Sequence, residues 1–495
     1  MKRRDLFKLG AGAAGWSFVA GCSRLSRKPR GIIFLVSDGM SQSVPALTEM
    51  FSQQLRSRGT RWNQWLADSA TVRVEMNTAS LNTPTTDSAA AGSAWGSGVR
   101  LINRSINTLA DRRPLKTLCE LTHESGRRNG LVTTSRMTHA TPAAFATQAF
   151  LRDDEDHIAP QYLGRVDVLH GGGLGHFSSE YRNDERDLLE EYRTAGYSIC
   201  PTRSAMLSDR SSRVLGLYTY DHLPYSIDHL ASASLQEKVP TLAELTADAL
   251  GRLDRREGFF LMVEAARVDH AAHVNDIAAL LHDQLAFDDA LAVADDWAQR
   301  AGDILVIATT DHGNSGPALN GMGLGYDLSG DCFARIADFK LSYSSLFIEL
   351  RGRLAMLKLS TAASLCKQIV QQHTGISLAP HETDALLTLL GIQDAQNTVY
   401  PNDWNHQHRS FYGIISQITG NWTGIGWTGS THTSEPAPLM ARGPGAQELS
   451  PLIQNTDIFD WITGLWNIRH RNPSLTLEES RKFIPRPTSP IAAGE

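Results

Sequence analysis

Short apolar runs alternate with amphipathic stretches along most of the chain. The first apolar run, GIIFLV, begins at Gly31 and ends just before Ser37 and Asp38. Runs of this length, bounded by turn residues, are typical of buried strands. Similar runs predict further strands at residues 71–75, 130–133, 166–169, 214–218, 259–263, 304–308 and 438–440. Residues 241–253 and 276–298 carry apolar side chains at three- and four-residue intervals, which predicts amphipathic helices.

This order of elements predicts the fold class. Strands that alternate with helices are typical of an α/β protein, so we expect a three-layer sandwich with a mostly parallel central sheet and helices on both faces. The alternation is interrupted between about residues 317 and 420, which predicts an inserted region within a main domain at residues 31–470. The Pro-rich tail at 471–495 is expected to be extended.

Composition and charge narrow the class of partner. The chain has 495 residues, of which 41% are hydrophobic and 20% are charged, as expected for a globular protein with a large core. The formal net charge is -6, and no Lys/Arg-rich block occurs beyond the first thirty residues. A nucleic acid is therefore not expected as a specific partner, because such binders carry a basic patch.

The first residues have the pattern of an export signal. The pair Arg3-Arg4 precedes about 12 apolar or small residues, which are too few to cross a bilayer that requires about 20. We therefore expect a twin-arginine export signal at residues 1–21 and a basic linker at 22–30. The sequence VAGC, which ends at Cys22, resembles a bacterial lipobox and implies a lipidated, membrane-anchored periplasmic protein. A cytosolic tail with a chance arginine pair is the alternative.

The other four cysteines are far apart in the sequence. They include no C-x-x-C pair, so a thiolate zinc site is not expected. We expect all four to be thiols of the core, with disulfide pairing in an exported chain as the alternative: Cys119, Cys200, Cys332 and Cys366.

Polar side chains follow three of the predicted strands, at the points where these strands end. Asp38 follows IIFLVS, Glu264 and Asp269 follow FFLMV, and the pair Asp311-His312 follows ILVIATT. In an open parallel sheet, ligands bind beyond the carboxyl ends of the strands. A single acid at such a position is commonly a helix cap or a turn residue. Three strand ends that carry acids together indicate a functional site.

The residue types at these positions indicate metal binding. Asp269 and His273 are spaced i, i+4, which places both side chains on one face of a helix, although such a pair alone is more often a surface contact. His432 lies in the Gly/Thr-rich stretch GWTGSTHTSE, where core packing explains it poorly. Histidines combined with aspartates favour zinc. An all-oxygen set favours magnesium instead: Asp38, Thr141 and Glu264.

The stretch TTDSAAAGSAWGSG, which begins at Thr85, is a candidate nucleophile region. Ser88 is predicted to begin a helix, where free N–H groups and the helix dipole favour a phosphate. The small residues after Ser88 leave room for metals and substrate. On its own, the same pattern is also typical of a tightly packed Ala/Gly/Ser-rich helix.

Seven motifs together resemble those of the alkaline phosphatase family. They occur in the family's order and extend over most of the chain from Gly31 to Ala446. The motifs are FLVSDGM, TTDSAAAGSAWGSG, THATPAAFATQAFLR, VDVLHGGG, GFFLMVEAARVDHAAH, ATTDHG and GWTGSTHTSEPAPLMARGPGA.

The resemblance implies three metal sites. One zinc ion is assigned to Asp269, His273 and His432. A second zinc ion is assigned to Asp38, Asp311 and His312, with Ser88 beside it as the nucleophile. The third ion, usually magnesium, is assigned to Asp38, Thr141 and Glu264. Two variable positions near this third site are occupied here by His139 and His270, which resembles the animal enzymes.

The resemblance also implies an activity. We expect hydrolysis of small-molecule phosphate monoesters through a phosphoserine intermediate, with Arg152 gripping the phosphoryl oxygens. A homodimer is implied by the family alone. A phosphodiesterase of the same superfamily and a non-catalytic, lipid-anchored metal-binding protein are the alternatives. The chain has no C-x-P-x-R motif of a sulfatase and no G-x-S-x-G motif of a serine esterase.

Overall fold

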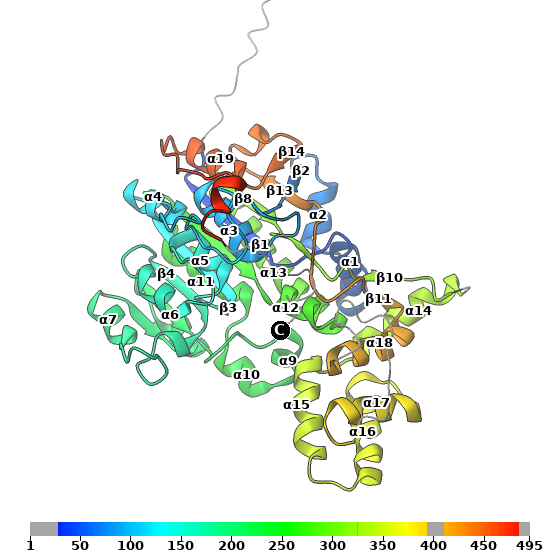
Figure 1. Ribbon diagram of the computed structural model, residues 1–495. Coiled ribbons are helices and arrows are strands. Elements are labelled where there is room, and N and C mark those ends of the chain that lie inside the picture. Colours follow the sequence, from blue (N-terminus) through cyan, green and yellow to red (C-terminus); the bar gives the residue numbers. More distant parts are fainter. Residues whose placement is uncertain (1–27, 324, 394–409, 485–495) are drawn as a thin grey trace, which may run out of the picture.

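The computed structural model describes residues 28–323, 325–393 and 410–484 (Figure 1). The predicted export signal, Cys22 and the last part of the Pro-rich tail lie outside the described residues. Among the described residues, no helix combines the length and the apolar character that crossing a membrane requires.

A ten-stranded sheet forms the centre of the protein. Its strand β13 is antiparallel to both of its neighbours, β2 and β8, whereas the other strand pairs of this sheet are parallel. The prediction of a mostly parallel sheet is therefore confirmed. In spatial order the strands are β14 (Leu452–Gln454), β2 (Val72–Asn77), β13 (Ala437–Arg442), β8 (Ile304–Thr309), β1 (Gly31–Ser37), β7 (Phe259–Ala265), β3 (Arg128–Arg136), β4 (Val168–Gly172), β6 (Val214–Leu217) and β5 (Ser198–Cys200).

The strand β1 lies inside the sheet and is buried along its whole length. Because successive side chains of a strand point to opposite faces, Ile33 and Leu35 enter one hydrophobic core, and Ile32 and Phe34 enter the other. The first core includes side chains of α1 (Val44–Arg56), α11 (Leu242–Leu253) and α13 (Ile277–Ala301). The second core includes side chains of α3 (Ser88–Ser97), α5 (Ala140–Ala146) and α19 (Asp457–Leu465). Helices thus cover both faces of the sheet, as predicted.

Shorter elements complete the main body. Two small ladders pair β9 (Gly313–Asn314) with β12 (His432–Thr433), and β10 (Ala318–Leu319) with β11 (Ile425–Gly426). The remaining helices of this part are α2 (Arg61–Ala67), α4 (Leu118–Glu124), α6 (Glu155–Ile158), α7 (Leu188–Thr194), α8 (Arg203–Ser208), α9 (Ser226–Ala231), α10 (Ala233–Lys238) and α12 (Arg267–His273).

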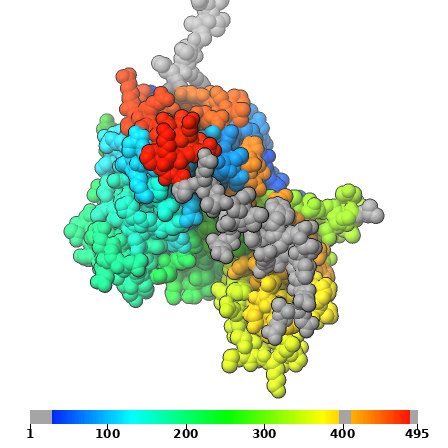
Figure 2. All heavy atoms as spheres, viewed as in Figure 1, coloured from blue at the N-terminus to red at the C-terminus, as the bar shows by residue number. Residues whose placement is uncertain are grey.

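The segment predicted as an insertion is mainly helical. Its helices α15, α16 and α17 form a lobe that projects from the main body (Figures 1 and 2). Two acids of the main body hold backbone N–H groups at the start of this lobe. Ser342 N donates to Oδ1 of the half-buried Asp228 at 2.8 Å, and Tyr343 N donates to Oδ2 of the buried Asp276 at 2.6 Å. The helices of this segment are α14 (Ser329–Ala334), α15 (Tyr343–Leu354), α16 (Leu359–Thr374), α17 (Pro380–Leu389) and α18 (Phe411–Thr423).

Two details differ from the sequence-based expectation. Cys332 is only half-buried, whereas the other three described cysteines are buried, and none of the four forms a disulfide. The described part of the Pro-rich tail is not extended throughout, because it forms the short helix α20 (Leu477–Ser480). The side chains of Thr476 and Glu479 cap this helix reciprocally, which supplies partners for its first N–H groups.

Candidate metal centre

Three adjacent strands, β8, β1 and β7, end at one edge of the sheet, and this edge carries the candidate site. Their parallel register aligns Val36 with Glu264 on one side and with Thr309 on the other. The acids that follow the strands therefore meet, as expected. Three groups of side chains lie close enough to hold a metal ion: Asp269, His273 and His432; Asp38, Asp311 and His312; and Asp38, His139 and Glu264.

The first group joins the short helix α12 to strand β12. His273 Nε2 lies 3.3 Å from Asp269 Oδ2, as expected for an i, i+4 pair on one helix face. His432 comes from a distant part of the chain and is placed opposite Asn314 by the β9–β12 ladder. The result is that His432 Nε2 lies 3.1 Å from His273 Nε2 and 3.6 Å from Asp269 Oδ1.

The hydrogen bonds of the two imidazoles fix which ring nitrogen carries a proton when each ring is neutral. His273 Nδ1 lies 2.8 Å from the carbonyl oxygen of Ser430, and His432 Nδ1 lies 2.8 Å from the carbonyl oxygen of Thr86. Because a carbonyl can only accept, each Nδ1 carries the proton, and in the neutral rings each Nε2 presents a lone pair. Two imidazole nitrogens and a carboxylate that face one another fit a cation between them, which is the arrangement seen around catalytic zinc.

The second group is buried completely. His312 Nε2 lies 3.1 Å from Asp311 Oδ2 and 3.7 Å from Asp38 Oδ1. The other oxygen of Asp311 is used structurally, because Oδ1 accepts hydrogen bonds from the backbone N–H of Gly39 and of His312. The imidazole of His312 also stacks on that of His432, with 3.7 Å between ring centroids, so the first two groups are in contact.

The third group shares Asp38 with the second. Among the described residues, neither carboxylate oxygen of Asp38 has a hydrogen-bond partner, and the same holds for Thr141 Oγ1, Glu264 Oε1 and His139 Nδ1. Buried polar atoms are nearly always hydrogen-bonded, so this set of orphans fits a bound cation. His139 supplies a ligand atom within this group, whereas the sequence placed it only near the third site.

The number of buried negative charges also indicates that the site binds cations. Asp38, Glu264 and Asp311 are 0% exposed and Asp269 is 4% exposed. Burial, together with the negative charges of Asp311, Asp269 and Glu264, raises the pKa of Asp38 well above its usual range. Buried carboxylates in this number are stable only when cations compensate them. The donor set of nitrogen and oxygen atoms therefore fits metal ions.

Ser88 is the first residue of helix α3 and faces the second group. Its Oγ lies 3.3 Å from His312 Nε2, and the residue is 2% exposed. The preceding residue, Asp87, caps the helix, because its Oδ1 accepts a hydrogen bond from Ala90 N at 3.0 Å. The free N–H groups and the positive dipole end of α3, which favour an anion, thus lie beside the second group.

The small residues of α3 are explained by its packing against α5. A Cβ atom built on Gly96 would lie 1.9 Å from the carbonyl oxygen of Ala144, and one built on Gly92 would lie 2.9 Å from the Ala144 side chain. A larger residue at these positions would push α3, and with it Ser88, away from the metal-binding groups.

Arg152 contacts both Asp87, the residue before Ser88, and His139 of the third group. Its NH1 group donates to Asp87 Oδ2 at 3.1 Å, and its NH2 group lies 3.1 Å from His139 Nε2. His270 lies behind His139, with 5.5 Å between ring centroids, and its Nδ1 is 2.9 Å from Arg267 NH1. All the site residues named from the sequence between positions 38 and 432 therefore lie in or beside this one centre.

Sequence reasoning missed His222, on the loop after β6. Its ring lies 4.4 Å from that of His270 and 5.6 Å from that of His139, measured between centroids, so three imidazoles are in contact beside the third group. The Asp221-His222 dipeptide gave no signal, because Asp-His pairs also occur elsewhere in the chain. Asn314 was also missed, although its Nδ2 donates to Asp269 Oδ1 at 2.6 Å.

Comparison with known proteins identifies the family. The family model described as alkaline phosphatase matches residues 29–467. Alkaline phosphatase 3 of Bacillus subtilis is 29% identical over 442 residues, which cover 87% of each chain. Streptomycin-6-phosphate phosphatase of Streptomyces griseus is 31% identical over 341 residues, which cover 58% of this chain and 74% of the relative.

A solved structure agrees with this family assignment. The crystal structure of Thermus thermophilus alkaline phosphatase superposes with a TM-score of 0.83 and 29% identity, and the match covers 93% of this chain and 96% of the other. The match extends over nearly the whole of both chains, so the two proteins share the overall fold. The chain belongs to the alkaline phosphatase family.

Proposed function

We propose that this protein hydrolyses phosphate monoesters through a phosphoserine formed on Ser88. Membership of the alkaline phosphatase family supports phosphate monoester hydrolysis in general. The observation that carries the finer proposal is the position of Ser88 Oγ, 3.3 Å from His312 Nε2 at the start of a helix and beside two groups that fit metal ions. The name of the Streptomyces griseus relative, streptomycin-6-phosphate phosphatase, is consistent with the same reaction class.

The metal ions proposed here are two zinc ions and one magnesium ion. The first two groups combine imidazole nitrogen with carboxylate oxygen, which suits zinc. The third group adds the oxygen atoms of Thr141 and Glu264, which suit magnesium, although His139 Nδ1 adds a nitrogen atom. When bound, such ions would activate the serine hydroxyl and stabilise the negative charge that develops on the departing oxygen.

The reaction then follows from the positions of the protein's own groups. Ser88 Oγ attacks phosphorus in line with the ester bond, and the bond from phosphorus to the alcohol oxygen breaks. The proton of the Ser88 hydroxyl passes to solvent water, and the departing alcohol oxygen takes a proton from solvent water. Water next attacks the phosphoserine, releases inorganic phosphate and restores the hydroxyl of Ser88.

Arg152 is proposed to hold the phosphoryl group during both steps. Its guanidinium is kept in place between Asp87, the residue next to Ser88, and His139 of the third group. A guanidinium can donate two parallel hydrogen bonds to two oxygens of one phosphoryl group. This fork is best used by the dianion of a monoester, which favours a phosphomonoesterase over the alternative, a phosphodiesterase.

The deciding experiment compares Ser88→Ala with the wild type on an aryl phosphate, with and without a metal chelator. We expect Ser88→Ala to lower kcat by about a thousandfold or more, since the nucleophile is lost. The matched control is Ser97→Ala at the other end of the same helix, where the hydroxyl donates only to Ser93 O; this variant should keep the wild-type rate. Wild-type enzyme quenched during turnover should also carry one phosphoryl group on Ser88 by mass spectrometry.

The outcomes separate the hypotheses. Unimpaired turnover by Ser88→Ala would exclude the phosphoserine. Wild-type turnover that persists after complete chelation would exclude the metal centre. If the wild type binds zinc but hydrolyses neither a monoester nor a diester, the non-catalytic alternative holds. A higher kcat/KM for an aryl diester than for the monoester would favour the phosphodiesterase.

We also propose that the protein is exported and lipidated at Cys22. The sequence supports this through the arginine pair and the VAGC ending, which lie outside the described residues. The test is the mass of the mature N-terminus: a chain that starts at a diacylated Cys22 is expected, and Cys22→Ala should abolish the lipid. A mature chain that retains Arg3 and Arg4 contradicts the proposal.

A further inference from the structure

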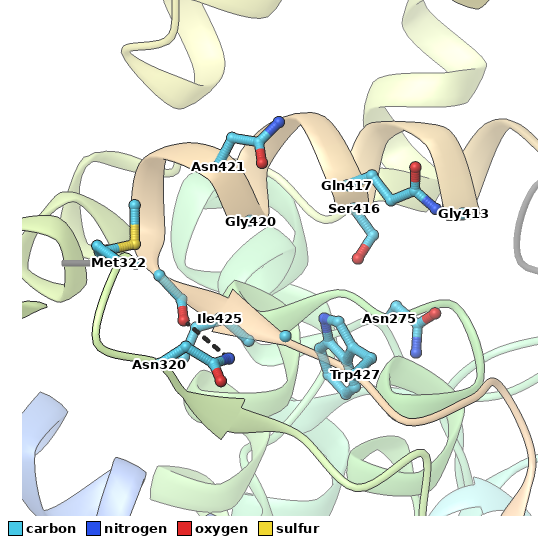
Figure 3. Close-up of a pocket in the computed structure, with 13 residues that line it drawn as sticks. Asn275, Asn320, Met322, Gly413, Ser416, Gln417, Gly420, Asn421, Ile425 and Trp427 are labelled. Carbon is cyan, nitrogen blue, oxygen red and sulfur yellow. Dashed lines mark hydrogen bonds between the residues drawn. The ribbon is translucent and has the colours of Figure 1, made fainter.

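A pocket of about 590 Å³ lies between α18 and the β10–β11 ladder, with Asn320 and Trp427 among the residues that line it (Figure 3). None of the described residues that line this pocket belongs to the three metal-binding groups. The pocket is therefore separate from the candidate centre. A residue that does contact the centre and has no assigned role is His222, on the loop after β6.

The rings of His139, His222 and His270 form a cluster beside the third metal-binding group. The centroid of the His222 ring lies 5.6 Å from that of His139 and 4.4 Å from that of His270, and the His139 and His270 centroids are 5.5 Å apart. Both contacts of His139 are edge-on, with interplanar angles of 84°. Aromatic rings favour this arrangement at such distances, so two neighbours restrict the rotation of the His139 ring.

The ring of His139 lacks the hydrogen bond that usually orients a metal-binding histidine. Such a histidine donates its second N–H to an acceptor, as His273 and His432 donate to backbone carbonyls. His139 Nε2 instead lies 3.1 Å from the NH2 group of Arg152, and a guanidinium can only donate. Within the described residues, His139 Nε2 therefore has no acceptor, and the contacts with the other two rings remain to orient it.

His222 and His139 are both bonded to the backbone of Arg136. His222 Nδ1 accepts a hydrogen bond from Arg136 N at 3.1 Å, and His139 N donates one to Arg136 O at 3.0 Å. Arg136 is held in turn by the carboxylate of Glu155, which accepts from Nε at 2.9 Å and from NH2 at 2.7 Å. The two imidazoles thus keep a fixed position relative to each other because one residue connects them.

The loop that carries His222 is held on both sides of this residue. Gly173 N donates to the carbonyl oxygen of Asp221 at 2.9 Å, and Leu223 N donates to that of Thr134 at 3.0 Å. Thr134 belongs to β3, and Gly173 follows directly after β4. The sheet therefore holds the ring of His222 in place through backbone hydrogen bonds on either side.

We propose that His222 is a positioning residue of the third metal site, whose ring holds the imidazole of His139 toward the ion that it shares with Asp38 and Glu264. The geometric basis is that ligand atoms of these three residues lie within 4.8 Å of one another, while His222 contacts His139 alone among them. Residues that orient a metal ligand from outside typically contribute about tenfold to a hundredfold to metal affinity. This inference rests on the proposed assignment of magnesium to the third group.

The test measures magnesium binding, by isothermal titration calorimetry, to protein loaded with two zinc ions per chain. His222→Ala removes the ring, and we expect the Kd for magnesium to rise about tenfold. His222→Gln keeps an acceptor for Arg136 N but has no ring, so it should raise the Kd similarly. His222→Phe keeps an aromatic ring without the acceptor, and its Kd should stay within about threefold of the wild type. A purely structural role of the hydrogen bond to Arg136 would give the opposite order, with rescue by Gln and none by Phe.

Two further variants serve as controls. His229→Ala also removes a half-buried imidazole, whose Nε2 donates to the carbonyl oxygen of Val239 at 2.9 Å. His229 belongs neither to the metal-binding groups nor to the imidazole cluster, so its loss should leave the Kd for magnesium unchanged. Thr141→Val removes an oxygen of the third group itself and should raise that Kd.

The outcomes separate the positioning role from the metal assignment. If the wild type binds no magnesium, or Thr141→Val leaves the Kd unchanged, the assignment of the third ion fails and this inference fails with it. If Thr141→Val raises the Kd but His222→Ala and His222→Gln do not, the assignment stands and the positioning role is wrong. An equal rise for Ala, Gln and Phe at position 222 also overturns it. Should His222→Ala not fold, a rise for Gln that Phe does not share supports the inference.

Discussion

Ser88 Oγ lies 3.3 Å from His312 Nε2, although 224 positions separate the two residues in the chain. One residue begins a helix that covers one face of the sheet, and the other follows the end of β8. The contact therefore depends on how the helix is seated against the strand ends. Variants that disturb either the metal-binding groups or the packing of helix α3 should therefore change the protein measurably.

Metal removal should destabilise the protein as well as inactivate it. Asp38, Asp269 and Asp311 lie together in the interior, and their mutual repulsion is no longer compensated after chelation. One ion present at about 1,000 times its Kd contributes about 4 kcal/mol to the free energy of unfolding. We expect calorimetry to show a lower Tm after chelation, restored by adding zinc and magnesium. An unchanged Tm after verified metal loss would be inconsistent with the centre.

Replacing Arg152 should weaken phosphate recognition more than it weakens the fold. In Arg152→Lys the charge stays, but the fork that donates two parallel hydrogen bonds is lost. We expect kcat/KM for an aryl phosphate to fall about tenfold to a hundredfold, with a parallel rise in the inhibition constant of inorganic phosphate. Arg104→Lys is the matched control, because Arg104 pairs with the exposed Asp153. If both variants lowered kcat/KM for the aryl phosphate equally, Arg152 would have no special role in phosphate recognition.

Much of the fold could be predicted because the sheet is buried on both faces. The central strands β1, β7 and β8 are nearly continuous apolar runs that are buried along their whole length, so the pattern predicts them directly. The edge strands β5 and β14 have three residues each and give no such signal. The helical lobe begins where the pattern changes. Its anchoring by Asp228 and Asp276 is a tertiary contact that no local pattern reveals.

The site could be predicted only in part from the residues themselves. Asp38 and Asp311 follow parallel strands, and the topology brings them together. His432 reaches the centre through a ladder of two residues, so the resemblance to a family was needed to assign it. His222 was missed by both routes, since its position depends on the loop after β6 and not on any local pattern.

The close approach of α3 and α5 predicts a sharp difference between two glycines. In Gly96→Ala the new Cβ would lie 1.9 Å from Ala144 O, so a helix has to move, and we expect a loss of about 3 kcal/mol in the free energy of unfolding. Gly251→Ala, in α11, meets nothing within 4 Å and should stabilise the protein by up to about 1 kcal/mol. Urea denaturation measures both. Similar stabilities of the two variants would contradict the packing described above.

His282 should make stability depend on pH. Its ring packs edge-on against Phe51, and burial, with a smaller effect of the positive charge of Arg56, lowers its pKa to about 4. In the unfolded chain the pKa is about 6.5. As the pH falls from about 6.5 to about 4, the unfolded chain binds a proton that the folded protein does not, so the folded state loses stability over this range.

The variant His282→Gln cannot take up this proton and should lose that part of the pH dependence. The measured quantity is the difference in unfolding free energy between wild type and variant, at about pH 7 and about pH 5. We expect the difference to shift in favour of the variant at the lower pH, by at most about 3 kcal/mol over the full range.

His381→Gln, on the exposed surface of α17, is the control and should retain the wild-type pH dependence. Because the metal centre is the same in all three proteins, its own loss of ions at acid pH cancels in the comparison. A difference between wild type and His282→Gln that stays constant with pH would show that the imidazole is protonated equally in the folded and unfolded states.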